Sequence, residues 1–132
     1  MKIYLGFTVA GSRSSIEAVK KILSVLESFG HDVLTSHLVS DDAWEADRSV
    51  APQKILARDM TWLAQCDLFV AEVTGSSFGL GFETGYLQGA TDKKTILFLS
   101  GAQSTGFLSS SPGTRTQTAY WRRTPISGNW RS

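Results

Sequence analysis

The chain has 132 residues, of which 13 are Lys or Arg and 12 are Asp or Glu, and its formal net charge is +1. This length suits one domain with a buried core, and the balanced charge gives no support to a nucleic-acid or membrane partner. Cys66 is the only cysteine, which excludes an internal disulfide and a cysteine pair for a metal. No run approaches the roughly 20 apolar residues of a membrane span, so we expect a cytoplasmic protein in a reducing compartment.

The chain opens with alternating strand and helix signals. Lys2 to Phe7 predicts a first strand, and a loop of small residues follows it. Apolar residues three or four apart between Ile16 and Phe29 predict a helix, which Gly30 is placed to end. Asp32 to Thr35 predicts a second strand.

The middle of the chain continues the same alternation. A polar loop through Asp41 and Trp44 leads to a second helix, for which Pro52 is a suitable first residue. That helix is predicted to run to about Cys66, with four side chains facing inward: Ile55, Leu56, Met60 and Leu63. A buried strand, a helix and a further strand are then predicted at Leu68–Val73, Gly79–Ala90 and Thr95–Leu99.

This order predicts an α/β fold, a flavodoxin-like doubly wound parallel sheet of four to five strands in three α/β/α layers. Residues 1–99 are expected to form the domain, and residues 100–132 an atypical tail, rich in Ser, Thr, Gly and Arg, without a sustained period. A disordered, functional tail is one explanation. The other, slightly favoured, is a reading-frame slip between Gly101 and Gly106, which an unbroken and unshifted coding sequence would exclude.

The most informative stretch surrounds Glu83. The predicted strand from Leu68 stops at the small polar turn 74–77, and Gly79 and Gly81 then let the backbone come close to a ligand. Glu83 is expected in the first turn of the next helix, at the edge where open α/β sheets bind ligands. There the helix N-terminus helps to keep a carboxylate ionised, as a nucleophile requires. Taken alone, Glu83 would be interpreted as an ordinary exposed acid.

A second acid, Asp59, lies four residues from both Ile55 and Leu63, and so on or beside the buried face of its helix. An equal alternative is a boundary residue that caps a neighbouring loop. If Asp59 points into the same cleft as Glu83, the pair suits glycoside chemistry. One carboxylate then attacks the anomeric carbon while the other handles the leaving group.

A phosphate-type loop and two aromatic side chains complete the candidates. The loop from Thr8 to Arg13 offers backbone N–H groups and a helix N-terminus to an anion, although a plain turn is the common alternative. It lacks the glycine patterns of dinucleotide folds and P-loops. Ser77 is placed to close over the same phosphate. Tyr4 is expected near the mouth of the first strand or simply in the core, and His37 beside a base or in solvent.

These residues together resemble the nucleoside 2-deoxyribosyltransferase superfamily. The resemblance rests on Tyr4 with the loop through Gly11, His37, the acid of A-R-D-M-T-W-L, and A-E-V-T-G-S-S-F-G-L-G-F-E-T-G. It is most similar to the 2'-deoxynucleoside 5'-phosphate N-hydrolase branch, over roughly residues 1–99. The resemblance implies cleavage of 2'-deoxynucleoside 5'-monophosphates to free base and 2-deoxyribose 5-phosphate through a covalent glycosyl-enzyme, in a homodimer without metal or other cofactor. Base exchange by a deoxyribosyltransferase, and a catalytically silent nucleotide-binding module, are the alternatives.

The resemblance also implies residue roles. Glu83 matches the nucleophile, Asp59 the acid that orients or protonates the departing base, and Tyr4 the group that positions the nucleophile. Ser109 is the nearest candidate for the serine that a neighbouring subunit contributes. The full set of substrate-binding candidates is Thr8, Val9, Ala10, Gly11, Arg13, His37, Ser77, Gly79 and Ser109. The phosphate loop departs from the family pattern, because Ala10 stands where an arginine is usual, with Arg13 as its possible substitute, and Phe7 where a glycine is usual.

Overall fold

The computed structural model describes residues 1–9, 15–100 and 116–121. Its sheet has the strand order β2-β1-β3-β4-β5, in which β1 to β4 run parallel and β5 is antiparallel to β4. The strands are β1 (Lys2–Gly6), β2 (Asp32–Val33), β3 (Leu68–Glu72), β4 (Lys94–Ser100) and β5 (Thr116–Trp121). The first four strands confirm the predicted doubly wound parallel sheet.

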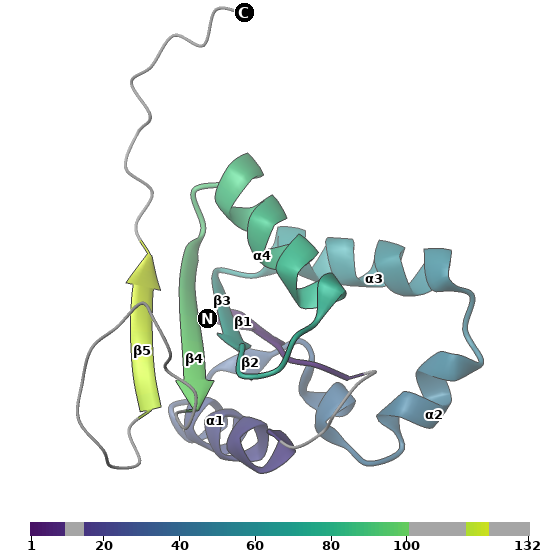
Figure 1. Ribbon diagram of the computed structural model, residues 1–132, viewed down its shortest axis with the longest axis horizontal. Helices are drawn as coiled ribbons and strands as arrows, with labels where there is room; N and C mark the ends of the chain where they lie inside the picture. The colour runs from purple at the N-terminus through teal and green to yellow at the C-terminus, as the bar shows by residue number, and fades with distance from the viewer. Residues whose placement is uncertain (10–14, 101–115, 122–132) are drawn as a thin grey trace, which may run out of the picture.

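Helices cover both faces of this sheet, as Figure 1 shows, with α1 on one face and α3 and α4 on the other. The helices are α1 (Ile16–Ser28), α2 (Ala43–Arg48), α3 (Pro52–Gln65) and α4 (Phe78–Ala90), with a 3-10 turn η1 at Ser36–Val39. The predicted three-layer α/β/α arrangement is therefore confirmed. In the described part of the chain, no helix has both the length and the apolar character needed to cross a bilayer.

The alternation of side chains along β1 divides the core into two clusters. Ile3 and Leu5 are buried on the α1 side, where Val19 of α1 packs against them. Tyr4 points to the opposite side, into a cluster with Leu63 of α3 and Leu87 of α4. Successive residues of a strand face opposite sides of a sheet, so the placement of Tyr4 on the α3 and α4 side follows directly from its position in β1.

The second strand is shorter than the sequence predicts, because a side chain takes over the pairing. Leu34 N–H still donates to the Ile3 carbonyl at 2.9 Å, but β2 itself ends at Val33. The fully buried Thr35 hydroxyl then accepts from Leu5 N–H at 3.0 Å and donates to the Leu5 carbonyl at 2.8 Å. The threonine therefore satisfies both backbone groups of Leu5 where a strand partner would otherwise stand.

The other predicted boundaries agree with the structure, and three further predictions are corrected. Gly30 ends α1 as predicted, with φ +74° and its N–H bonded to the Glu27 carbonyl. The expected polar loop contains the short helix α2. Leu56, predicted to face inward, is 52% exposed on α3. The predicted tail contributes β5, whose polar sequence gave no strand period, and which pairs with the edge strand β4.

Candidate active site

A pocket of about 460 Å³ lies at the carboxyl ends of β1 and β3. The strand order reverses direction between these two strands, because the chain continues from β1 to β2 on one side and from β3 to β4 on the other. Such a switch point is where open α/β sheets bind ligands. The pocket is lined by Tyr4, Leu5, Gly6, Phe7, Val9, Leu38, Asp47, Arg48, Val50, Pro52, Ile55, Arg58, Asp59, Ser77, Gly79, Leu80 and Glu83.

The three predicted catalytic residues line this one pocket from three different elements. Tyr4 comes from β1, Asp59 from α3 and Glu83 from α4. The Tyr4 hydroxyl donates to Glu83 Oε1 at 2.9 Å. Burial raises the pKa of Tyr4, and the nearby charges of Glu83 and Asp59 raise it further, so the phenol stays a hydrogen-bond donor at physiological pH.

Glu83 occupies a different helical position from the one predicted. Because α4 begins at Phe78, Glu83 lies in its second turn, and the first turn holds no acid. The helix dipole acts mainly within the first turn, so it does not govern this carboxyl. Burial raises the pKa of Glu83 to about 7, the hydrogen bond from Tyr4 opposes that rise, and the charge of Asp59 adds to it.

Asp59 is half-buried and held by an arginine beside it in the chain. Arg58 Nε donates to Asp59 Oδ1 at 3.1 Å, while its Nη1 and Nη2 donate to Asp47 of α2 at 2.8 and 3.1 Å. Burial raises the pKa of Asp59, and the hydrogen bond and charge of Arg58 pull it down again. The same guanidinium lowers the pKa of Asp47.

The predicted base contact, His37, is exposed and is not among the pocket-lining residues. Its ring meets the edge of Trp62 at a centroid distance of 5.2 Å. The Arg58 guanidinium carbon lies 4.8 Å from the centre of the Trp62 ring system. His37 and Arg58 thus both contact Trp62, and the role of His37 as a base contact stays a prediction.

The predicted phosphate side is described in part. Val9, Ser77 and Gly79 line the pocket. The Ser77 hydroxyl also caps α4, accepting from Leu80 N–H at 3.3 Å. Thr8 is buried and does not line the pocket, and its hydroxyl has no hydrogen-bond partner among the described residues. Four predicted contacts lie outside the described residues: Ala10, Gly11, Arg13 and Ser109.

Arg58 and Asp47 line the pocket, and neither was foreseen from the sequence. Arg58 and Trp62 are four residues apart on α3, a spacing that predicts a guanidinium over an indole. Asp47 was assigned to a polar loop, which gave no direction to its side chain. For a metal, no group of three His, Cys, Asp or Glu side chains suited to binding one occurs in the described part of the chain. The expected absence of a cofactor stays a prediction.

Comparison with known proteins gives the chain a family. The model of the nucleoside 2-deoxyribosyltransferase family matches residues 3–118. A protein of Thermofilum pendens, named among the 2'-deoxynucleoside 5'-phosphate N-hydrolases, is 42% identical over 65% of this chain and 59% of its own length. A 5-hydroxymethyl-dUMP N-hydrolase of Esox lucius is 34% identical over 74% of this chain and 69% of its own.

A solved structure shares the fold. The CMP N-glycosidase of Clostridium botulinum superposes with a TM-score of 0.55 at 23% identity, covering 81% of this chain and 75% of that one. At this identity the likeness concerns the fold alone. The chain spans 59% of the length of the Thermofilum pendens relative. The match over residues 3–118 nevertheless includes all of the residues found to line the pocket, and the chain belongs to the nucleoside 2-deoxyribosyltransferase family.

Proposed function

We propose that this protein hydrolyses the N-glycosidic bond of 2'-deoxynucleoside 5'-monophosphates, giving the free base and 2-deoxyribose 5-phosphate. The observation that carries the proposal is the hydrogen bond from Tyr4 to Glu83, in a pocket that Asp59 also lines. Two carboxyl groups at one pocket, one of them oriented by a phenol, are the catalytic groups that glycoside hydrolysis requires. The names of the relatives, which are N-hydrolases of such nucleotides, support the same reaction.

The proposed reaction has two steps. The ionised Glu83 attacks C1' of the sugar, the bond from C1' to the base nitrogen breaks, and the base leaves with the bonding electrons and takes a proton from the Asp59 carboxyl. Water then attacks C1', gives its proton back to Asp59, and releases Glu83 as a carboxylate together with the sugar phosphate. The sum consumes one water. Tyr4 keeps one oxygen of Glu83 in place, which leaves the other for the sugar carbon.

The phosphate of the substrate is proposed to lie between Val9 and Ser77. Both line the pocket, and Ser77 is the N-cap of α4, where backbone N–H groups favour an anion. Ala10, Gly11 and Arg13 are proposed to complete this side, and Gly79 to let the backbone approach. We propose residues 1–99 as the catalytic domain, to whose sheet the segment 100–132 adds β5.

Base exchange is the second candidate, and the family name favours it, since nucleoside 2-deoxyribosyltransferases pass the sugar to a second base. Deoxynucleoside monophosphates and the corresponding deoxynucleosides are incubated with and without a different free base, and the products are separated by chromatography. Hydrolysis predicts free base and 2-deoxyribose 5-phosphate without an acceptor. Exchange predicts a new nucleoside or nucleotide that requires the acceptor. Binding without release of base would indicate a silent module.

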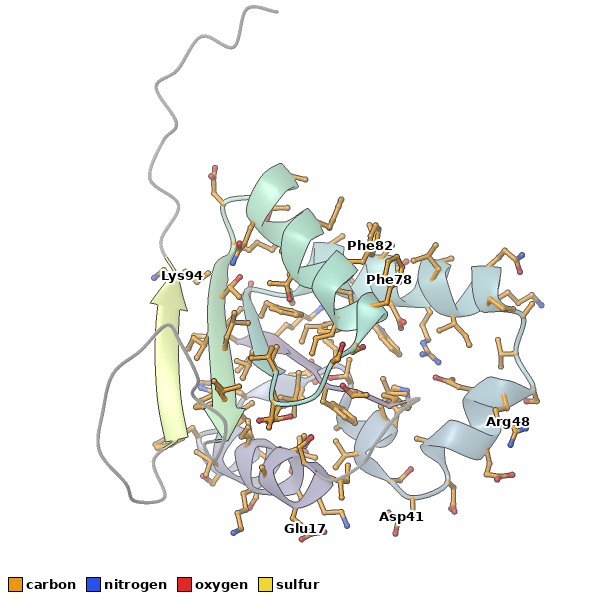
Figure 2. The ribbon with its side chains drawn as sticks, in the orientation of Figure 1. Glu17, Asp41, Arg48, Phe78, Phe82 and Lys94 are labelled. Carbon is orange, nitrogen blue, oxygen red and sulfur yellow. The ribbon has the colours of Figure 1, made fainter. Side chains whose placement is uncertain are left out.

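The catalytic assignment is tested with Glu83→Ala, which we expect to abolish turnover. Glu17→Ala is the matched control, because Glu17 is an exposed acid of α1, which covers the other face of the sheet (Figure 2). Cleavage at a normal rate by the Glu83 variant would refute the assignment of the nucleophile.

A homodimer and a cytoplasmic location are also proposed. Phe78 is 93% exposed on α4, and Phe82 one turn later is exposed beside it (Figure 2). Exposed aromatic groups clustered on one helix are typical of an interface, and a second copy placed there would lie next to the Gly79 and Glu83 wall of the pocket. Light scattering should show a dimer that Phe78→Ser with Phe82→Ser converts to monomer. The location rests on the cysteine count and is tested by cell fractionation.

A further inference from the structure

A chain of contacts links α2 to the proposed acid of the pocket through one arginine. Asp47 holds the two terminal nitrogens of Arg58 with both carboxylate oxygens, at 2.8 and 3.1 Å. The third donor, Nε, reaches Asp59 Oδ1 at 3.1 Å. All three side chains line the pocket. A guanidinium held in this forked way has a fixed plane and a fixed direction for each remaining N–H.

The contact between Arg58 and Asp59 is not one that a helix produces by itself. Neighbouring residues on an α-helix point about 100° apart, and side chains at i and i+1 do not face each other. Something outside α3 must therefore turn the arginine towards its neighbour. Asp47 does so from α2, and Trp62, one turn along α3, supports the guanidinium from its face with 4.8 Å between the guanidinium carbon and the ring centre.

We infer that Asp47 and Arg58 act together as positioning residues for Asp59, holding its Oδ1 so that the other carboxylate oxygen is presented to the departing base. The inference rests on the proposed function for the role of Asp59, and it assigns a task to two residues outside the set Tyr4, Asp59 and Glu83. Neither Asp47 nor Arg58 needs to touch the reacting atoms.

Charges on every side bear on the ionisation of Asp59. His37 lies on η1, Asp47 on α2 and Arg58 on α3 itself, and Tyr4 and Glu83 face the same pocket from β1 and α4. The hydrogen bond and the charge of Arg58 each lower the pKa of Asp59, and each effect is larger than the repulsion from Asp47, which raises that pKa. Asp47 therefore has two opposite effects, a direct repulsion that raises this pKa and an indirect lowering through the arginine it anchors.

Because the two effects of Asp47 on the pKa of Asp59 are opposite, a titration can distinguish an anchor of Arg58 from a nearby negative charge. In Asp47→Ala, loss of the repulsion alone would lower the pKa of Asp59. Loss of the anchored Arg58 contact would raise it. We expect the titration midpoint of the Asp59 carboxyl, followed by carbon NMR of the full chain and assigned with Asp59→Asn, to move to higher pH. A downward move, or none, overturns the inference. Glu45→Ala, which removes an exposed acid of the same helix, should leave the midpoint unchanged.

A second variant covers the case in which removal of Asp47 unfolds α2. Arg58→Lys keeps the positive charge but loses the fork, so it should release Asp59 and move its midpoint in the same upward direction. Retention of the wild-type midpoint by this variant would show that charge alone is sufficient and would contradict the inference. Neither titration requires turnover, so a failure of the proposed function does not affect the outcome.

Kinetics give an independent measurement. Asp47→Ala and Arg58→Lys should each lower kcat/KM roughly 10- to 100-fold, as a misplaced catalytic group does. In the Asp59→Asn background the same changes should have little further effect, because they act through Asp59. Losses that multiply in full with that of Asp59→Asn would show a separate, structural role and would overturn the inference. Wild-type protein that releases no base would instead refute the proposed function.

Discussion

The Tyr4 hydroxyl donates to Glu83 Oε1 across 2.9 Å, joining the middle of β1 to the second turn of α4. The two residues are 79 positions apart in the sequence. Their meeting requires β1 to present Tyr4 on the face that α4 covers, and α4 to pack close to the end of β1. Burial raises the pKa of Glu83 to about 7 and Tyr4 opposes that rise, so this hydrogen bond increases the fraction of ionised nucleophile.

Tyr4→Phe should therefore change both the rate and its pH dependence. A hydrogen bond to a charged group contributes about 1.5–3 kcal/mol, so kcat/KM should fall roughly 10- to 100-fold at neutral pH. Activity requires ionised Glu83 and should decline below the pKa of about 7 in the wild type. Without the donor that pKa rises, and the acidic limb of the kcat/KM profile should move to higher pH.

The matched control for this change is Tyr86→Phe. Tyr86 is a partly exposed tyrosine of α4 whose ring stacks on that of Phe82. It does not line the pocket. Its hydroxyl should be dispensable for the pH profile. An unchanged acidic limb in Tyr4→Phe would mean that the phenol does not influence the ionisation of Glu83.

Glu83→Gln should make the fold more stable above neutral pH. The pKa of Glu83 is raised in the folded state from 4.5 to about 7, so its contribution is most favourable below pH 4.5 and is lost as pH rises through 7. At pH 8 the wild type carries a half-buried charge that glutamine lacks. Allowing for solvent screening, we expect a gain of about 1–3 kcal/mol in the free energy of unfolding.

Urea denaturation at pH 8 and at pH 5 measures this difference. The advantage of Glu83→Gln should shrink at pH 5, where the wild-type side chain is mostly protonated. Glu27→Gln, at an exposed position of α1, should show no such pH dependence. An equal advantage at both pH values would contradict a raised pKa at Glu83.

The elements of the sheet and its helices were predictable because their apolar periodicity is local. Gly30 and Pro52 marked helix boundaries for stereochemical reasons that a sequence displays directly. Asp59 and Glu83 were also accessible, since each lies at a defined position relative to an apolar stripe or a strand end. Their convergence on one pocket follows from the strand order, which the alternation of strands and helices implies.

What could not be predicted depends on contacts between distant segments. Asp47 has no apolar periodicity around it, and only the packing of α2 against the pocket gives its carboxylate a partner on α3. The ionisation of Glu83 was expected to follow the helix dipole but depends on burial, a property of the assembled layers. The polar strand β5 takes its conformation from pairing with β4, which no local pattern indicates.

Thr35→Val should destabilise the fold although it removes no apolar contact. The buried hydroxyl bonds both the N–H and the carbonyl of Leu5, and valine would leave these two groups unsatisfied in the core. The expected loss is about 1–3 kcal/mol in the free energy of unfolding, measured by urea denaturation. Thr35→Ser keeps the hydroxyl and should lose clearly less. A Thr35→Val variant as stable as the wild type would contradict a stabilising role for the two hydrogen bonds.

Gly6→Ala tests how closely α4 must approach the end of β1. A Cβ at Gly6 would lie 2.8 Å from Leu80 Cδ1 and 3.1 Å from Phe69 Cζ, so the Leu80 side chain must move. Leu80 is three residues before Glu83 on α4, and its displacement should move the carboxyl away from Tyr4. We expect a loss of roughly tenfold in kcat/KM and of about 1–3 kcal/mol in stability, the usual effect of overpacking.

A double variant identifies the clash as the cause. Leu80→Ala alone should cost about 2–5 kcal/mol, but combined with Gly6→Ala it makes room for the new methyl group. The summed destabilisation should therefore exceed that of the double variant. Gly89→Ala, at an α4 glycine with nothing within 4 Å of the added Cβ, should instead stabilise by about 0.5–1 kcal/mol. Strict additivity of the first two changes would mean that Gly6 is required for a reason other than its contact with Leu80.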